Sequence, residues 1–475
     1  MTAIGQRRTR RTIAAATIAL GLVIAASVLF TVGVVTLSNS QEGEAVGVDT
    51  RPTVTFPPTH NALLAVTDDE GQLTSVVVLT LLPEGQGGSI VTVPVNADAT
   101  AGFGLQRRPL NEFFDPSDPE GFTAEVEDML SITIEQSEVV DPAGLEALLE
   151  PLGPVQVVLP DAVIDTDAVD TGAADPSGTV TDSTVTDSSA PDDTSPDGTI
   201  LDPNAAPDPT VGVDGVIVTA GPQILETPQV VEVLTSIDES VAAYDLHAID
   251  VAMWAAIAQK APVNVPAEPV PADELGRPVP PATVADLAAL LFDGPVGVRD
   301  LAVAPAGAAT NPTGTDVVVI DRADTVLVFA QISPSLVSTP NTGFKMRIEG
   351  QYTQDQLAAS AGLYDTNSDL ARELVGRLLF LQANIVSVDT SETGAPDVTI
   401  IEVADPALYD ETVRAGEILF GPSEVRVATT LIEGVDIVVT LGTSYLDREV
   451  AAAAATNGAE GLGDTVPADT VGPDG

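Results

Sequence analysis

Apolar residues along this chain form one long uninterrupted run near the N-terminus and many short runs after it. Residues 12–38 contain no charged side chain, and the run exceeds the ~20 residues that cross a hydrocarbon core of ~30 Å. Arginines precede it and acidic residues follow it, which predicts a cytoplasmic N-terminus. A cleaved signal peptide would have a shorter apolar stretch of ~7–15 residues. We therefore expect a basic cytoplasmic tail over 1–11, a transmembrane helix over 12–38 and an extracytoplasmic remainder.

The short runs that follow indicate an α/β domain over residues 58–335, after a polar, proline-containing stalk over 39–57. Three β-branched segments are only partly alternating, which predicts strands buried on both faces: NALLAVT, LTSVVVLTLL and SIVTVPV. GFTAEVEDML and DPAGLEALLEPLG predict helices, and Asp141 and Pro142 supply the cap and first position of the second. GPVQVVLP predicts another buried strand.

The composition changes over about 161–210, where Asp, Thr, Ser, Pro and Gly replace the large apolar residues. Such a segment cannot offset chain entropy by burial, so we expect a disordered insert. Order returns with the predicted strand DGVIVTAG and the helices TPQVVEVLTSI and YDLHAIDVAMWAAIAQK. Further along, TVADLAALLFDG predicts a helix, and VGVRDLAVA, DVVVI and DTVLVFAQI predict strands.

A second, smaller α/β domain is predicted over residues 342–448, because strands and helices alternate there. The predicted strands are FKMRIEG, NIVSVD, DVTIIEVA, EVRVATTL and VDIVVTLG, and the predicted helices are SDLARELVGRLLFLQAN and DPALYDETVRAGEILFG. Asp405 caps the second helix and Gly421 follows its end. Residues 449–475 are rich in Ala, Gly and Asp, and we expect a disordered tail.

Charge and composition exclude several classes of function. The chain has 70 acidic residues against 18 basic ones, a formal charge of −52, which argues against a nucleic-acid partner. There is no cysteine, so disulfides, thiol nucleophiles and thiolate metal sites are excluded. Two histidines cannot build a histidine-rich metal site. No Lys or Arg occurs between Arg108 and Lys260.

Few motifs in the chain suggest chemistry. Phosphate loops and the GxSxG elbow are absent. Asp68 and Asp69 cluster in a predicted turn and are candidate Mg²⁺ ligands, although a solvated hairpin turn explains them as well. Arg107 and Arg108 are the basic pair outside the N-terminal tail, and they suit either one phosphate or a plain surface position. His247 stands alone on a predicted helix, where a packed or surface role is favoured over a catalytic one.

Several short segments between Asn61 and Gln259 resemble the LytR-CpsA-Psr family in their order along the chain. The family's Gly-Ser-Asp-Ser-Arg strand end resembles residues 66–70, where Asp68 is kept and Glu70 replaces the arginine. Its Lys-Ile-Asn-Ala segment resembles residues 109–112 and keeps Asn111.

Other family segments are matched with their charged residues lost. Arg-Ser-Asp-Thr resembles residues 73–76 without the Arg or the Asp, and Ser-Ile-Pro-Arg-Asp resembles residues 92–96, also without them. The helix motif Asp-Phe-x-Arg-x-x-Arg-Gln resembles residues 245–252, with both arginines absent. Residues 344–446 resemble the LytR C-terminal domain, whose final Leu-Gly-x-Asp-Tyr is matched with Ser444 in place of the Asp.

The resemblance implies an extracytoplasmic α/β domain behind one transmembrane helix. It also implies a phosphotransferase that moves glycopolymers from a polyprenyl-pyrophosphate lipid to the cell wall. No catalytic residue is assigned; the candidates are Asp68, Asn111, Arg107 and Arg108. Cations stabilise the charge on the transferred phosphoryl oxygens, and each 1.4 kcal/mol lost lowers the rate about tenfold.

Because the family's arginines are missing, we expect a non-catalytic scaffold or binding protein without a cofactor, linked to cell-wall polymer assembly. Its expected partners are the membrane, polyprenyl-linked glycopolymer, peptidoglycan or other envelope proteins. One alternative is a surviving transferase that uses Mg²⁺ on Asp68 and Asp69, with Arg107 or Arg108 as its cation. The other is a structural interaction module unrelated to wall polymers.

Overall fold

The computed structural model describes residues 49–100, 107–164, 216–236, 241–262, 279–307, 311–338, 343–360 and 362–460. The predicted cytoplasmic tail, the predicted transmembrane helix over 12–38 and residues 165–210 of the insert predicted over about 161–210 lie outside these ranges. The first residues of that insert are ordered, because Val163–Ile164 form a strand. None of the helices within them is both long and apolar enough to cross a membrane. The chain divides after Thr53, and residues from Val54 onward belong to one unit.

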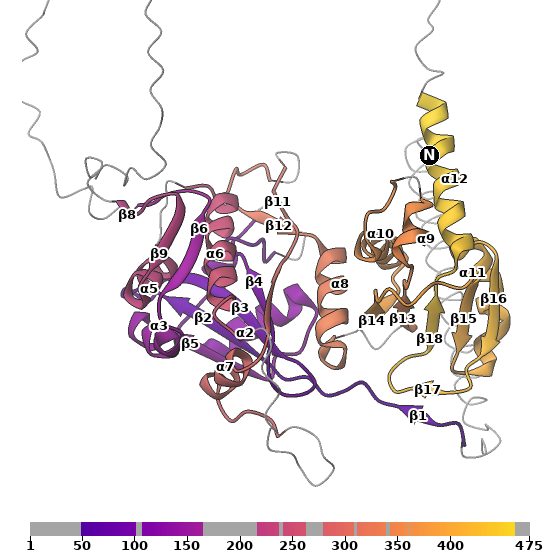
Figure 1. Ribbon diagram of the computed structural model, residues 1–475, viewed down its shortest axis with the longest axis horizontal. Helices are drawn as coiled ribbons and strands as arrows, with labels where there is room; N and C mark the ends of the chain where they lie inside the picture. The colour runs from indigo at the N-terminus through magenta and orange to yellow at the C-terminus, as the bar shows by residue number, and fades with distance from the viewer. Residues whose placement is uncertain are drawn as a thin grey trace, which may run out of the picture. The chain divides into compact units, whose positions relative to one another are not determined.

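A five-stranded mixed sheet forms the centre of the first domain (Figure 1). Its order is β10-β4-β3-β2-β5, with β2 (Asn61–Thr67), β3 (Leu73–Leu81), β4 (Gly88–Val93), β5 (Gln136–Val140) and β10 (Val296–Asp300). β2, β3 and β4 form an antiparallel meander, while β5 and β10 add in parallel at its two edges. Nearly every residue of the three central strands is buried, which confirms the prediction of strands covered on both faces.

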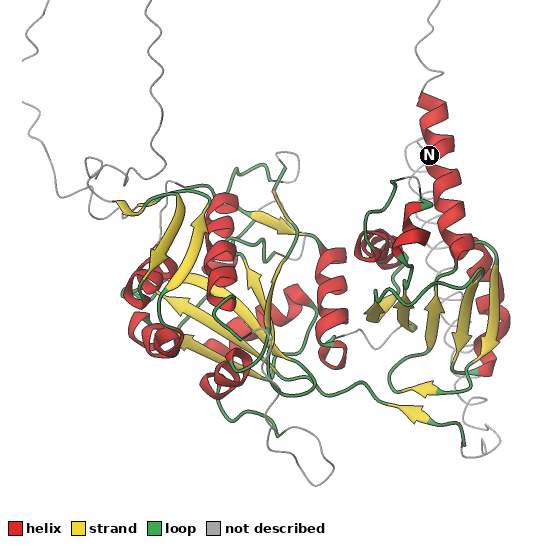
Figure 2. Ribbon diagram, in the orientation of Figure 1, coloured by secondary structure: helices red, strands yellow, loops and turns green. Residues whose placement is uncertain are grey.

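Helices cover both faces of this sheet (Figure 2). One face carries α3 (Pro142–Leu149), α5 (Thr227–Thr235), α6 (Ala243–Ala258) and α7 (Val284–Phe292). The other face carries α2 (Pro119–Leu130) and one side of α8 (Arg322–Ile332). Residues alternate between the two cores along each strand, as the pleat requires: Val77 and Leu79 face the first set of helices, and Val76 and Val78 face the second.

Short strands and 3₁₀ turns surround the central sheet. They are η1 (Leu110–Phe113), η2 (Glu150–Leu152), β6 (Val155–Leu159), β7 (Val163–Ile164), β8 (Val216–Val218), β9 (Gly221–Leu225), β11 (Val303–Pro305), β12 (Val318–Ile320) and η3 (Pro334–Leu336). The strand β1 (Thr53–Val54) belongs to a separate two-stranded sheet. β6 was predicted to be buried on both faces, but it pairs with β9 outside the central sheet and alternates between buried and exposed residues. β9 was not predicted.

The segment DTVLVFAQI, predicted as a strand, is the helix α8. Asp321 starts it, since its side chain accepts hydrogen bonds from the backbone N–H groups of Ala323 (2.8 Å) and Asp324 (3.4 Å). The helix lacks a polar face because it packs into two cores. Phe329 enters the sheet core of the first domain, and Val326 enters the core of the C-terminal domain. Burial on both sides removes the helical periodicity on which a sequence prediction depends.

The C-terminal domain is a five-stranded sheet with helices against it. Its order is β14-β13-β18-β15-β16, with β13 (Lys345–Glu349), β14 (Asn384–Asp389), β15 (Thr399–Val403), β16 (Ser423–Val427) and β18 (Ile437–Thr440). The remaining elements are α9 (Gln354–Ala358), α10 (Asn367–Phe380), η4 (Pro406–Leu408), α11 (Tyr409–Phe420) and β17 (Leu431–Ile432). The predicted strands are confirmed. The predicted helix after Asp405 divides into η4 and α11, and it ends at Gly421 with φ +74°.

The predicted disordered tail from residue 449 is wrong at its start, because α12 (Thr443–Glu460) continues to Glu460. Tyr445 and Leu446 in its first turns are buried in the domain core. Glu449 is 5% exposed, and its Oε2 accepts a hydrogen bond from Arg377 Nη2 at 2.7 Å. These anchors hold the start of an alanine-rich segment, which is a strong helix former by itself.

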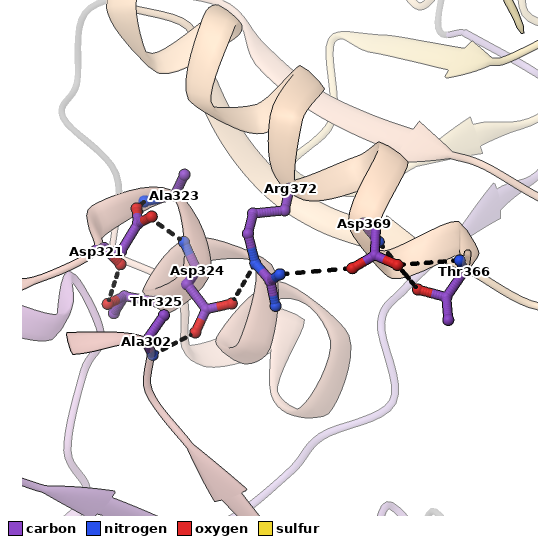
Figure 3. A network of polar contacts seen from close by, with 8 residues as sticks. All are labelled: Ala302, Asp321, Ala323, Asp324, Thr325, Thr366, Asp369 and Arg372. Atoms are coloured by element: carbon purple, nitrogen blue, oxygen red, sulfur yellow. Dashed lines mark hydrogen bonds and ion pairs between the residues drawn. The ribbon is translucent and has the colours of Figure 1, made fainter. Parts of the chain in front are cut away.

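An ion pair links α8 to α10 (Figure 3). The carboxylate of Asp324 is buried, and it accepts hydrogen bonds from Arg372 Nε at 2.7 Å and from the backbone N–H of Ala302 at 2.8 Å. Arg372 also lies 3.6 Å from Asp369 in the first turn of α10. The buried carboxylate therefore depends on one guanidinium and one backbone amide.

We expect Arg372→Ala to lower the free energy of unfolding by about 1–3 kcal/mol, because Asp324 would keep a buried charge without its partner. Arg414→Ala is the matched control: Arg414 is an exposed arginine whose Nε donates to the backbone oxygen of Asp410 at 3.2 Å, with no carboxylate partner among the described residues. That variant should stay within about 0.5 kcal/mol of the native chain. Chemical denaturation followed by circular dichroism measures both. Equal stability of the two variants would contradict the role of this pair.

Candidate functional site

Polar side chains gather along the edge of the central sheet that is formed by the ends of its strands, not by its outer strands β5 and β10. β2 and β4 end there and the antiparallel β3 begins there, so Asp68, Ser75 and Asn96 share this edge. β10 runs parallel to β4 and brings Asp300 to the same edge. Helix α6 packs against β4 and β10, and its residue Asp250 contacts Ser75. The resemblance to the LytR-CpsA-Psr family falls on these same segments.

A buried hydrogen-bonded chain joins α6 to β3. The Ser75 hydroxyl donates to Asp250 Oδ1 at 2.6 Å and accepts from Trp254 Nε1 at 3.0 Å. Ser75 and Trp254 are fully buried. Burial raises the pKa of the Asp250 carboxyl to about 6, although the hydrogen bond from Ser75, the neighbouring His247 and Trp254 oppose this increase. The edge of the sheet thus contains a carboxyl group that ionises only near neutral pH.

His247 lies one helical turn before Asp250 and is bonded to a different carboxylate. Its Nε2 is 2.9 Å from Asp300 Oδ1, and the side chain is buried. Its Nδ1 is buried without a hydrogen-bond partner among the described residues. Ser75 bonds directly to Asp250, so the imidazole does not lie between a serine and a carboxylate, as a nucleophilic triad requires. Of the packed and surface roles that we expected for His247, the structure shows the packed one.

The predicted metal ligands lie in the turn between β2 and β3. Asp68 Oδ1 accepts hydrogen bonds from the backbone N–H groups of Glu70 (2.9 Å) and Gln72 (2.7 Å), and Asp69 is exposed beside it. This is the local bonding of a hairpin turn. The described part of the chain has no group of three or more His, Cys, Asp or Glu residues placed to hold a metal ion. Mg²⁺ binding at Asp68 and Asp69 stays a prediction.

The two candidate cations are each paired with a carboxylate. Arg107 forms an ion pair with Asp98, and both side chains are mostly buried. Arg108 Nε is 2.9 Å from Glu112 Oε2, and its guanidinium lies 4.2 Å from the centroid of the Phe113 ring. These carboxylates neutralise the positive charge of the two arginines, which a diphosphate would need for binding.

Asn111 is the remaining candidate. Its Nδ2 donates to Asn96 Oδ1 at 3.4 Å in an exposed position. The antiparallel meander brings this amide pair to the same sheet edge as Asp68, but the structure shows no hydrogen bond among the four candidates Asp68, Arg107, Arg108 and Asn111 in the described residues.

The resemblance places the family's two helix arginines at Ala248 and Val251, on either side of Asp250. An acidic residue with a raised pKa thus lies between the positions where the family has two cations. Sequence reasoning missed Ser75, Asp250 and Asp300. Asp250 lies inside the segment that carries the resemblance, but nothing in the sequence shows that it contacts Ser75.

The cavity that the described residues form beside this site is small. Asp250 borders a cavity of about 40 Å³ between α6 and the start of β7, which Val163, Leu234 and Ile249 also line. Pockets for small-molecule ligands usually have about 300–1,000 Å³. The apolar side chains between the sheet and α3, α5, α6 and α7 form one continuous core. The cavity suits ordered water.

Comparisons with known proteins gave matches among solved structures. No protein-family model matches the chain, and no curated protein matches it. The chain is similar to structures of LytR-CPS2A-psr family proteins.

Three such structures illustrate the similarity. The Lin1025 protein from Listeria innocua is 12% identical over 59% of this chain and 99% of its own length, with a TM-score of 0.31. TagV from B. subtilis is 12% identical over 60% and 99%, with a TM-score of 0.35. The LytR-CPS2A-psr family protein YwtF (TagT), solved with bound octaprenyl pyrophosphate lipid, is 12% identical over 56% and 86%, with a TM-score of 0.31.

Trp254 is the only tryptophan of the chain, so its fluorescence reports on this site. We expect its emission to titrate with a midpoint near pH 6, because Asp250 ionises there and is connected to the indole through Ser75. The transition should disappear in Asp250→Asn and persist in the control Asp68→Asn. A transition lost in His247→Gln but kept in Asp250→Asn would assign it to the imidazole and contradict this prediction.

The raised pKa of Asp250 also makes stability depend on pH. The pKa of this carboxyl is about 6 in the folded chain and has its ordinary value of 3.8 in the unfolded chain, so the folded chain binds the proton more tightly. The resulting stabilisation is complete below pH 3.8 and is lost as the pH rises through about 6. The loss amounts to about 3 kcal/mol. We therefore expect the difference in free energy of unfolding between Asp250→Asn and the native chain to favour the variant by about 3 kcal/mol more at pH 7 than at pH 3.5. Denaturation followed by Trp254 fluorescence measures this difference. Parallel pH profiles would show that Asp250 is not the titrating group.

Proposed function

We propose that this chain is a non-catalytic, membrane-anchored protein of the cell envelope that binds or scaffolds partners in cell-wall polymer assembly. One observation carries the proposal: the bonded chain Trp254–Ser75–Asp250 lies where the resemblance expects the arginines of a glycopolymer phosphotransferase. The anchor rests on the apolar run over 12–38 and places the two α/β domains outside the membrane.

Electrostatics support the absence of transferase activity. Above about pH 6 the Asp250 carboxyl is ionised, and it would repel the developing charge on a pyrophosphate group. Arg107 and Arg108 are already paired with Asp98 and Glu112. Freeing either arginine for a ligand would leave its carboxylate unpaired, and for the mostly buried Asp98 that cost is the larger.

Space supports the same conclusion. A polyprenyl chain needs a long apolar cavity, whereas the cavity that the described part of the chain forms beside Asp250 has about 40 Å³. The helices on that face are packed directly against the sheet. The scaffold is thus suited to presenting its surface to a partner.

Two alternatives remain. A surviving transferase would use Mg²⁺ at Asp68 and Asp69, and the retained Asp68 is the feature that favours it. A structural interaction module without any link to wall polymers would share the same fold, and the two differ in whether the chain binds wall material.

We expect the purified chain, supplied with a polyprenyl-pyrophosphate-linked glycopolymer and cell-wall acceptor, to release no polyprenyl phosphate, with or without Mg²⁺, and Asp68→Ala to leave this result unchanged. Mg²⁺-dependent release that Asp68→Ala abolishes would establish the transferase instead. Retention of the chain on purified cell wall separates the two non-catalytic functions: a chain that stays in the unbound fraction is not a wall-polymer scaffold.

A further inference from the structure

We propose that a second pocket, on the opposite face of the central sheet from Asp250, binds a saccharide that carries a negative charge. The pocket has a volume of about 580 Å³, within the usual range for small-molecule sites. Its lining includes Thr80, Ser89, Arg299, Arg347 and Asp389. It is formed where β3 ends and β4 begins, together with the ends of α8 and β14.

The strand pleat separates this pocket from the candidate site. Ser75 faces α6, and residues five apart along a strand point to opposite faces, so Thr80 faces the side that α8 covers. Thr80 and Ser89 are direct cross-strand partners in β3 and β4. In the same way Asp300 faces α6, and the preceding residue Arg299 points to the other face.

Thr80 carries an unused hydrogen-bonding group. The residue is 1% exposed, and its Oγ1 has no partner among the described residues. A buried hydroxyl without a partner usually costs about 1–3 kcal/mol, so it calls for a ligand or an ordered water. Ser89 lies beside it, and together they provide hydroxyl groups that can both donate and accept.

Arg299 provides a cation that has no carboxylate partner. No hydrogen bond or ion pair of its guanidinium occurs with any of the described residues, and the side chain is exposed at the pocket. The other arginine, Arg347, is bonded to Glu349 at 2.8 Å and lies 3.6 Å from Asp389. Arg299 combines a guanidinium without a carboxylate partner among the described residues with a position in the lining of this pocket, so it can bind an anionic group there.

The chemistry of the lining selects the ligand class. Phe56, Pro57 and Pro334 offer apolar surfaces for the C–H face of a sugar ring, and the hydroxyls and the Arg347–Asp389 pair suit its hydroxyl groups. A prenyl chain would leave the hydroxyl and guanidinium groups of the lining without partners, and a bare phosphate would leave most of the pocket empty. One unpaired guanidinium favours a sugar with an anionic group.

Isothermal titration calorimetry with glucose 6-phosphate, glucose and inorganic phosphate tests this proposal on the full chain. We expect glucose 6-phosphate to bind best. Arg299→Ala should weaken its binding about tenfold or more, since it removes a charge-assisted hydrogen bond. Thr80→Val, which keeps the shape and removes the hydroxyl, should weaken the binding of glucose 6-phosphate and of glucose alike. The exposed Arg414→Ala is the matched control and should bind as the native chain does.

Three outcomes would overturn the proposal. They are no binding of glucose 6-phosphate at millimolar concentration, unchanged binding by Arg299→Ala, and inorganic phosphate binding as tightly as glucose 6-phosphate. Trp254 fluorescence identifies variants that fail to fold, because the indole lies on the other face of the sheet. This test uses free sugars, so it is independent of whether the chain is retained on cell wall.

Discussion

Burial of β2, β3 and β4 on both faces is the constraint on which the first domain depends. Each fully buried Val or Leu contributes roughly 1.5–3 kcal/mol, and these strands consist largely of such residues. The same burial makes each polar residue in the strands costly unless it is hydrogen-bonded, because a buried hydroxyl needs a partner. Ser75 obtains partners from α6, whereas Thr80 has none among the described residues. The candidate site and the proposed saccharide pocket both follow from polar positions in an otherwise apolar sheet.

The many acidic residues determine how the backbone N–H groups at helix starts and the few arginines are paired. Many carboxylates serve as helix caps, as Asp118, Asp141 and Asp321 do, where they satisfy free backbone N–H groups. Others bind the few arginines, so Arg107, Arg108 and Arg372 are unavailable to an anionic ligand without losing an ion pair. Among the described residues, the candidate cations near this edge of the sheet are therefore held by carboxylates, whereas Arg299 has no such partner there.

The errors of prediction have a common physical origin. The strand predicted at residues 324–332 is the helix α8, because packing against two cores overrides the β-branched preference of its residues. The tail after Glu449 is helical, because Tyr445 and Glu449 anchor it to the domain. At the candidate site, Asp68 was identified from a local pattern, and the structure shows it in the turn. Asp250 was missed because its partner Ser75 is 175 residues away.

The sequence alone determined the order of most strands and helices, the exclusion of cysteine chemistry and the scarcity of cations, since these follow from local periodicity and composition. It also determined that the arginines of the resembled family are absent. Only the tertiary structure decided that Asp250 bonds to Ser75, that Arg107 and Arg108 are held by carboxylates and that Arg299 and Thr80 border one pocket. Those relations depend on which distant segments meet across the sheet, and the free energy of such contacts is set by packing that no short window of sequence contains.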